Sequence, residues 1–211
     1  QNPLAVDSVW KLLGKYAIPC VISLLVNSLY NMVDQIFIGQ GVGYLGNGAT
    51  NIIYPLTVIV LSIALMLGDG GASFLSLRLG EGKKEEGAKG IGSVITFSVV
   101  VGIIIAVLMA VFLEDLVYLF GCTAMDYGRI IIIGLPFVLV GTVFTAIERA
   151  DGSPQYSMVS LLVGAVTNTI LDPIFIFVFQ WGVKGAALAT IIGQIFTFLM
   201  GLKYIRRFRS I

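Results

Sequence analysis

Three aspartates stand inside long apolar stretches of the sequence, where charged side chains are rare: Asp34, Asp69 and Asp172. No Lys or Arg stands inside the same stretches to pair with them. A carboxylate held away from water is costly unless it takes up a proton or binds a cation. Because the sequence has no histidine, a proton carried by side chains within these stretches has to be carried by the carboxyl groups. The aspartates are therefore candidates for proton or cation binding.

Amide side chains at helical spacing accompany two of these aspartates. Asn168 precedes Asp172 by four residues, which is about one helical turn. Asn27, Asn31 and Asp34 follow an i, i+4, i+7 pattern, which places them on one helix face. Hydrogen bonds between helices, worth about 1 kcal/mol each, explain the amides equally well. For carboxyl groups inside a membrane helix, a functional role is the default expectation.

The composition indicates what kind of protein contains these stretches. Of the 211 residues, 57% are hydrophobic and 12% are charged, and the mean hydropathy is +0.97. A soluble domain carries about 25% charged residues, so a soluble domain is excluded, and a net charge of +1 excludes a nucleic-acid-binding protein. Six apolar runs are long enough to cross a bilayer as helices, at about 20 residues each. They predict an all-α membrane protein with one domain, residues 1–211, and spans at approximately 16–39, 51–77, 91–113, 127–147, 157–179 and 185–203.

The basic residues predict the orientation of these spans. Eleven of the thirteen Lys and Arg residues flank the spans on one side, which the positive-inside rule places in the cytoplasm together with both termini. Asp34 and Asp172 then lie in the outer half of the cell membrane, roughly 7–10 Å below the outer ends of their helices at 1.5 Å per residue. On the sixth span, Thr190 lies at a similar depth and Gln194 one turn deeper. Asp69 lies in the inner half, where it either lines a cytoplasmic vestibule or is structural.

Two prolines stand close to this chemistry. Pro19 interrupts the first span, which also carries Asp34, and Pro173 directly follows Asp172. Proline has no backbone N–H, so each leaves a carbonyl one turn earlier without its helical donor. Such free carbonyls can accept a bond from a protonated carboxyl group or bind a cation. Pro19 is the expected place of a movable bend in the first helix.

Four stretches taken together resemble the multidrug and toxic compound extrusion (MATE) transporters. Residues 27–39 (NSLYNMVDQIFIG) resemble the first helix of that family, and residues 149–158 (RADGSPQYSM) resemble its loop between helices four and five. Residues 168–175 (NTILDPIF) resemble its fifth helix, and residues 182–190 (GVKGAALAT) the entry to its sixth. The resemblance extends over nearly the whole chain.

The resemblance implies a fold of twelve helices in two six-helix lobes. It also implies exchange of cationic or amphiphilic drugs for H⁺ or Na⁺, without a cofactor. The family's first-lobe cation site corresponds here to Asp34, Asn168, Asp172 and Thr190, and its bending proline corresponds to Pro19. Because this chain resembles one lobe, a second lobe is the expected partner, either as a C-terminal half or as a second copy of the chain.

Other functions fit the sequence less well. A flippase for lipid-linked sugars, from the same superfamily, would be expected to hold a pyrophosphate with Arg or Lys inside the spans, and the sequence has none there. A membrane scaffold that transports nothing does not need three intramembrane carboxyl groups. An enzyme is not expected, because the sequence shows no nucleophile–base pair, phosphate loop or metal motif. Cation-coupled drug efflux is the leading hypothesis.

Overall fold

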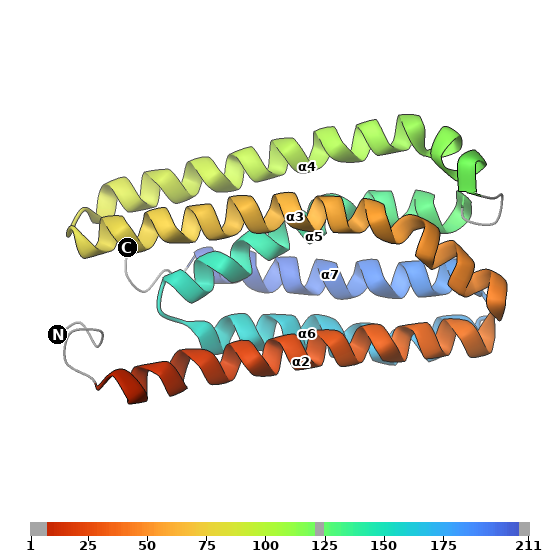
Figure 1. Ribbon diagram of the computed structural model, residues 1–211, viewed down its shortest axis with the longest axis horizontal. Coiled ribbons are helices and arrows are strands. Elements are labelled where there is room, and N and C mark those ends of the chain that lie inside the picture. The colour runs from red at the N-terminus through yellow and green to blue at the C-terminus, as the bar shows by residue number, and fades with distance from the viewer. Residues whose placement is uncertain (1–7, 121–124, 207–211) are drawn as a thin grey trace.

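The computed structural model describes residues 8–120 and 125–206, and its elements are helices. The helices alternate in direction along one long axis, so that α2 begins and α7 ends at the same end of the bundle (Figure 1). In chain order they are α2 (Val9–Gly41), α3 (Tyr44–Gly80), α4 (Lys84–Phe120), α5 (Met125–Ala150), α6 (Pro154–Pro173), the π-helical η2 (Ile174–Val178) and α7 (Val183–Ile205).

Each of the six predicted spans lies within this series. Five of them lie within one α-helix each, and the fifth span is formed by α6 together with η2. In the described part of the chain, six helical segments are long and apolar enough to cross a membrane. The predicted all-α, six-helix fold class is therefore confirmed.

The fifth span departs from a regular α-helix at its C-terminal end. α6 ends at Pro173, and the π-helical η2 follows it. Directly after η2, the Phe179 N–H donates to the Ile174 carbonyl, five residues earlier, at 2.9 Å. Pro173 donates no bond to the preceding turn, which loosens the helix at this point. Single π-turns are frequent at functional sites, and this one begins two residues after Asp172.

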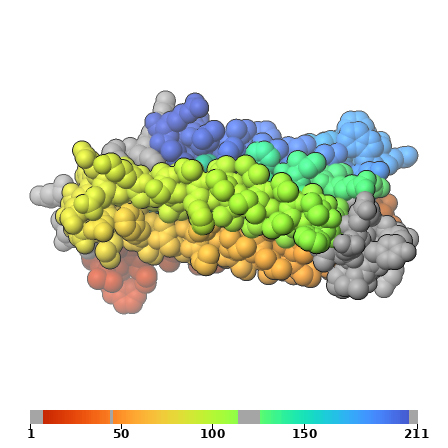
Figure 2. Space-filling view, turned by 90° about the horizontal axis from the view of Figure 1, so that it is seen from above, coloured from red at the N-terminus to blue at the C-terminus, as the bar shows by residue number. Residues whose placement is uncertain are grey.

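α5 is the central helix of the bundle. It packs against α3, α4, α6 and α7, and 67% of its most apolar stretch is buried, compared with 11% in α2 and in α4. Figure 2 shows α4 lying along the length of one outer face, with α3 on one side and α7 on the other. The core side chains of α5 recur every four residues: Ile131, Leu135, Leu139, Val143 and Ile147. The apolar outer faces of α2 and α4 are suited to contact with lipid.

α6 and α7 approach each other closely at a pair of glycines. A Cβ added to Gly193 would lie 2.7 Å from the Gly164 carbonyl oxygen, and one added to Gly164 would lie 2.9 Å from the Gly193 carbonyl oxygen. Small residues allow membrane helices to bring their backbones together in this way. The contact lies one turn or more below Asn168 and sets the distance between α6 and α7 near that residue.

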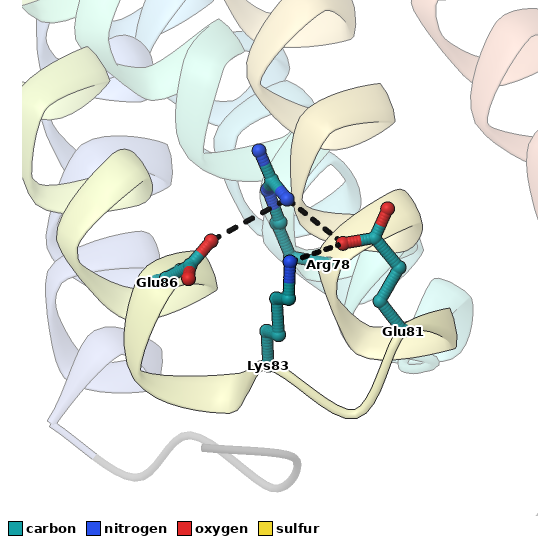
Figure 3. A network of polar contacts seen from close by, with 4 residues as sticks. All are labelled: Arg78, Glu81, Lys83 and Glu86. Atoms are coloured by element: carbon teal, nitrogen blue, oxygen red, sulfur yellow. Dashed lines mark hydrogen bonds and ion pairs between the residues drawn. The ribbon is translucent and has the colours of Figure 1, made fainter.

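The turn between α3 and α4 is held by a network of ion pairs (Figure 3). Arg78 lies 2.8 Å from Glu81 and 3.4 Å from Glu86, and Lys83 lies 3.3 Å from Glu81. The hydrogen bond from Arg78, followed by that from Lys83, holds the pKa of the Glu81 carboxyl below its ordinary value. These side chains are largely exposed, so the network positions the turn and adds little to stability.

The basic side chains gather at one end of the bundle. Of the eleven Lys and Arg residues that the structure describes, nine lie on turns and helix ends at the end where α2 begins. The other two, Arg129 and Lys184, lie at the opposite end, where Lys184 pairs with Asp126 at 3.0 Å. This asymmetry is the physical basis for the orientation predicted from the sequence.

Candidate cation-binding site

Asp34 and Asp172 meet in the half of the bundle that lies away from the basic end. Asp34 is on α2 and Asp172 on the last turn of α6, and these two helices pack against each other (Figure 1). Asp34 is 8% exposed and Asp172 is completely buried. Their carboxyl groups lie within hydrogen-bonding reach of each other. Two carboxyl groups this close in a low-dielectric interior do not both stay ionised unless a cation lies between them.

Asn168 connects Asp172 to Thr190 of α7. One end of the Asn168 amide lies 3.2 Å from Asp172 Oδ2, and the other end lies 3.3 Å from Thr190 Oγ1. Thr190 Oγ1 can in turn donate to the Ala186 carbonyl, at 3.0 Å. The amide therefore suits either form of Asp172: its NH₂ donates to a carboxylate, and after a half-turn its oxygen accepts from a protonated carboxyl group.

The structure thus brings together Asp34, Asn168, Asp172 and Thr190, from three helices. Asp34 and Asp172 each keep one oxygen, Oδ1, that has no hydrogen-bond partner among the described residues. The carboxyl oxygens, the amide oxygen and the hydroxyl are the hard ligands that a proton or Na⁺ prefers. That this cluster binds a cation stays a prediction.

Two tyrosines beside this cluster were not among the predicted site residues. The Tyr30 hydroxyl lies beside Asn31 and Gln194 and close to both aspartates. Tyr127 of α5, which is 9% exposed, also lies near both aspartates. Tyr30 precedes Asp34 by four residues, and that spacing was a usable signal. No such signal was available for Tyr127, because a sequence does not show which face of α5 turns toward the aspartates.

The remaining polar residues of the predicted stripe separate into two environments. Asn27 and Gln194 line a cavity between α2, α6 and α7 of about 20 Å³, which is room for about one water molecule. Asn31 is exposed, and its amide donates to the Asn27 carbonyl of its own helix at 2.6 Å. Asn27 and Gln194 therefore extend the polar cluster inward, whereas Asn31 is exposed and reaches the cluster only through its contact with Tyr30.

An apolar layer covers the cluster at its outer side. Ile38 of α2, Ile176 of η2 and Ala186 of α7 pack together there and are all buried. Phe37 and Phe177 add an edge-to-face ring contact with centroids 6.2 Å apart. The layer separates the two aspartates from the end of the bundle that lies away from the basic side chains.

Asp69 lies apart from this cluster, and one expectation about it is wrong. Arg149 stands on the last turn of α5, which extends beyond the predicted span, and its Nη2 lies 3.7 Å from Asp69 Oδ1. Asp69 thus has a cationic partner from just beyond the predicted fourth span, whereas it was expected to be unpaired because no Lys or Arg stands inside the spans. Its side chain is 64% exposed, which fits a surface or vestibule position better than a buried one.

Pro19 is buried near the basic end of α2, far from Asp34. Fifteen residues separate the two, which is about 22 Å along a helix. α2 is continuous through Pro19, and the carbonyl of Pro19 itself accepts a bond from the Ser23 hydroxyl at 2.7 Å. The carbonyl that the missing proline N–H leaves without its helical donor is that of Lys15. The predicted bend at Pro19 stays a prediction.

Known proteins share both the sequence pattern and the fold. The MatE family model matches residues 19–174. "Probable multidrug resistance protein YoeA" of Bacillus subtilis is 27% identical over 222 residues, which is 98% of this chain and 48% of that protein. "Multidrug export protein MepA" of Staphylococcus saprophyticus is 29% identical over 215 residues, 95% of this chain and 46% of that protein.

A solved crystal structure of a mutant MATE superposes with a TM-score of 0.93 at 26% identity, over 99% of this chain and 48% of that chain. The chain spans about half the length of the relatives and of the structure that it matches. The family match includes Asp34, Asn168 and Asp172, whereas Thr190 lies beyond its last residue. This multi-pass membrane protein belongs to the MatE family.

Proposed function

We propose that the chain is the cation-binding lobe of a secondary transporter that exports cationic or amphiphilic drugs in exchange for H⁺ or Na⁺. The observation that carries this proposal is the buried pair Asp34 and Asp172, because two carboxyl groups are costly to bury in an apolar bundle and such groups are by default functional. Two relatives named as multidrug resistance and export proteins support the class of substrate.

The proposed exchange is a competition for negative charge. When the pair is ionised, it attracts a cationic drug into the lobe; when H⁺ or Na⁺ enters from outside, the charge is neutralised and the drug leaves. The Asn168 amide would turn over in the same step, because it donates to ionised Asp172 and accepts from the protonated form. A local change of charge would thereby alter the contact between α6 and α7.

The transporter is proposed to contain a second six-helix lobe. The matched relatives are about twice as long as this chain, and a cavity between two lobes gives a drug a larger site than the cavity of roughly 20 Å³ beside Asn168 and Thr190. The second lobe would be supplied by a C-terminal half or by a second copy of this chain.

Transport by vesicles tests this function directly. Inverted vesicles that contain the complete transporter should accumulate a fluorescent cationic drug when a pH or Na⁺ gradient is imposed. The gradient that drives uptake identifies the coupling ion, and vesicles without the protein are the control. Uptake that is absent under both gradients would contradict the proposal.

The proposed orientation makes a separate prediction. With Cys20 and Cys122 replaced by alanine, Lys84→Cys should react with a membrane-impermeant maleimide only after the cells are opened, because nine basic residues mark its end as cytoplasmic. Lys184→Cys, at the opposite end, should react in intact cells. The reverse labelling pattern would show that the lobe is inserted the other way.

A further inference from the structure

The buried face of α6 is polar along most of its length. The buried residues of this helix include Asp172 and Asn168 at the outer end, Gly164 in the middle, and Ser160 and Ser157 towards the basic end. They are spaced by three or four residues and so form one stripe. A buried polar stripe in a membrane helix is costly, and here it leads away from the Asp34–Asp172 pair towards the other side of the lobe.

α7 continues this stripe across the helix contact. Thr190 lies beside Asn168, and Thr197, seven residues later, lies within 3.3 Å of the Ser160 carbonyl. The small cavity described above lies between these two levels and is lined by residues of both, Asn168 and Thr190 at one end and Thr197 at the other. Polar groups and a water-sized space therefore connect the aspartate pair to the level of Ser160.

Glu148 of α5 stands at the inner end of this connection. Its side chain is 1% exposed, and neither carboxyl oxygen has a hydrogen-bond partner in the part of the chain that the structure describes. The Ser160 hydroxyl lies beside it but directs its proton to the Tyr156 carbonyl, at 3.0 Å. While the Ser160 hydroxyl donates to that carbonyl, its oxygen can accept a hydrogen bond from a protonated Glu148.

The charged and titratable groups around Glu148 are engaged elsewhere. Arg149, the adjacent residue on α5, turns to Asp69 of α3. On the other side, Tyr204 of α7 lies near Glu148. Its hydroxyl donates to Asp151 at 2.6 Å, and its ring contacts the Tyr156 ring of α6. The Arg149 charge acts on the Glu148 carboxyl group from nearby, but Arg149 makes its ion pair with Asp69 and no described residue makes a hydrogen bond to the Glu148 carboxyl oxygens. A buried carboxylate without a direct partner is strongly disfavoured.

We infer that Glu148 is a second proton-binding site of the lobe, which holds a proton in this conformation. It exchanges that proton with the Asp34–Asp172 pair through the cavity and the hydroxyls of Ser160 and Thr197. Asp151 and Tyr204, one turn further on, mark the side from which the proton leaves to the cytoplasm. Proton binding at Glu148 stands by itself, whereas the role of the route rests on the proposed function.

Infrared spectroscopy of the purified protein tests the protonation without any transport. A carboxyl C=O band that shifts when isotope-labelled glutamate is incorporated should be present at neutral pH and lost in Glu148→Gln, which keeps the shape of the side chain. Glu85→Gln, on the exposed first turn of α4, is the matched control and should keep the band. A wild-type protein without such a band, or a band that survives in Glu148→Gln, would overturn the assignment.

Proton flux tests the route. In proteoliposomes with a pH-sensitive dye inside, a substrate gradient should drive proton movement in the wild type and in Glu85→Gln, and that movement should be lost in Glu148→Gln while drug binding is retained. Unchanged flux in Glu148→Gln would refute the route. Absence of flux in the wild type would refute both the route and a proton-coupled function, while the infrared result would still decide proton binding at Glu148.

Discussion

Replacing Asp172 with asparagine is expected to abolish export against a gradient, with a fall in the drug accumulation ratio on the order of 100-fold. Asparagine keeps the volume of the side chain, and its amide can still bond to Asn168 across 3.2 Å. What it removes is the ability to change charge. Since Asp172 is completely buried and lies beside Asp34, the loss leaves a single carboxyl group that no longer needs to share a proton or cation.

The measurement is drug accumulation in inverted vesicles under the gradient that drives the wild type, with drug binding measured separately. Asp34→Asn should give the same loss, and the double variant should be no worse than either single one, because the two carboxyl groups act as a unit. Asp126→Asn is the matched control: it removes an exposed carboxylate on α5 that pairs with Lys184 and lies apart from the Asp34–Asp172 pair. If both single variants still pumped with unchanged pH and Na⁺ dependence, the pair would be a brace between α2 and α6 and nothing more.

The arrangement of this pair shows what a sequence can predict. Depth along each span, counted in residues, already placed Asp34, Asp172 and Thr190 at one level. Helical spacing added Asn168, because i, i+4 positions share a face whatever the neighbours are. Counting could not give the rotation of each helix about its axis, and this is why Tyr127 of α5 was missed although it stands near both carboxyl groups.

The ends of the helices were the least predictable part of the fold, and the roles of two residues were missed for this reason. The predicted fourth span stopped at residue 147, one residue before Glu148, whereas α5 continues to Ala150. Placed outside the span, Glu148 was not recognised as a buried carboxyl group and Arg149 was not recognised as the partner of Asp69. A span predicted from hydropathy ends at the first charged residues. It therefore ends too early where the helix continues and its charged residues are buried within the bundle.

Replacing Gly193 with alanine is expected to destabilise the lobe by about 1–3 kcal/mol, the usual cost of overpacking a close contact. The new Cβ would lie 2.7 Å from the Gly164 carbonyl oxygen and 3.2 Å from the Asn168 Cβ. The carbonyl oxygen belongs to the backbone and the Asn168 Cβ is attached to it, so neither group can rotate away as the tip of a side chain can. α6 and α7 would have to separate, which would also lengthen the 3.3 Å contact between Asn168 and Thr190.

Thermal unfolding in detergent measures the loss of stability. The rise in unfolding temperature on addition of the coupling cation measures the damage to the contact between Asn168 and Thr190. Gly92→Ala in α4 is the matched control, because a Cβ there meets nothing within 4 Å, and alanine is the better helix former by roughly 1 kcal/mol. The two glycine-to-alanine changes should therefore have opposite signs. If Gly193→Ala proved as stable as the wild type and kept its cation protection, the close contact of α6 and α7 would not be what holds Asn168 against Thr190. The cluster would then have to be positioned by the packing of α2 on α6 alone.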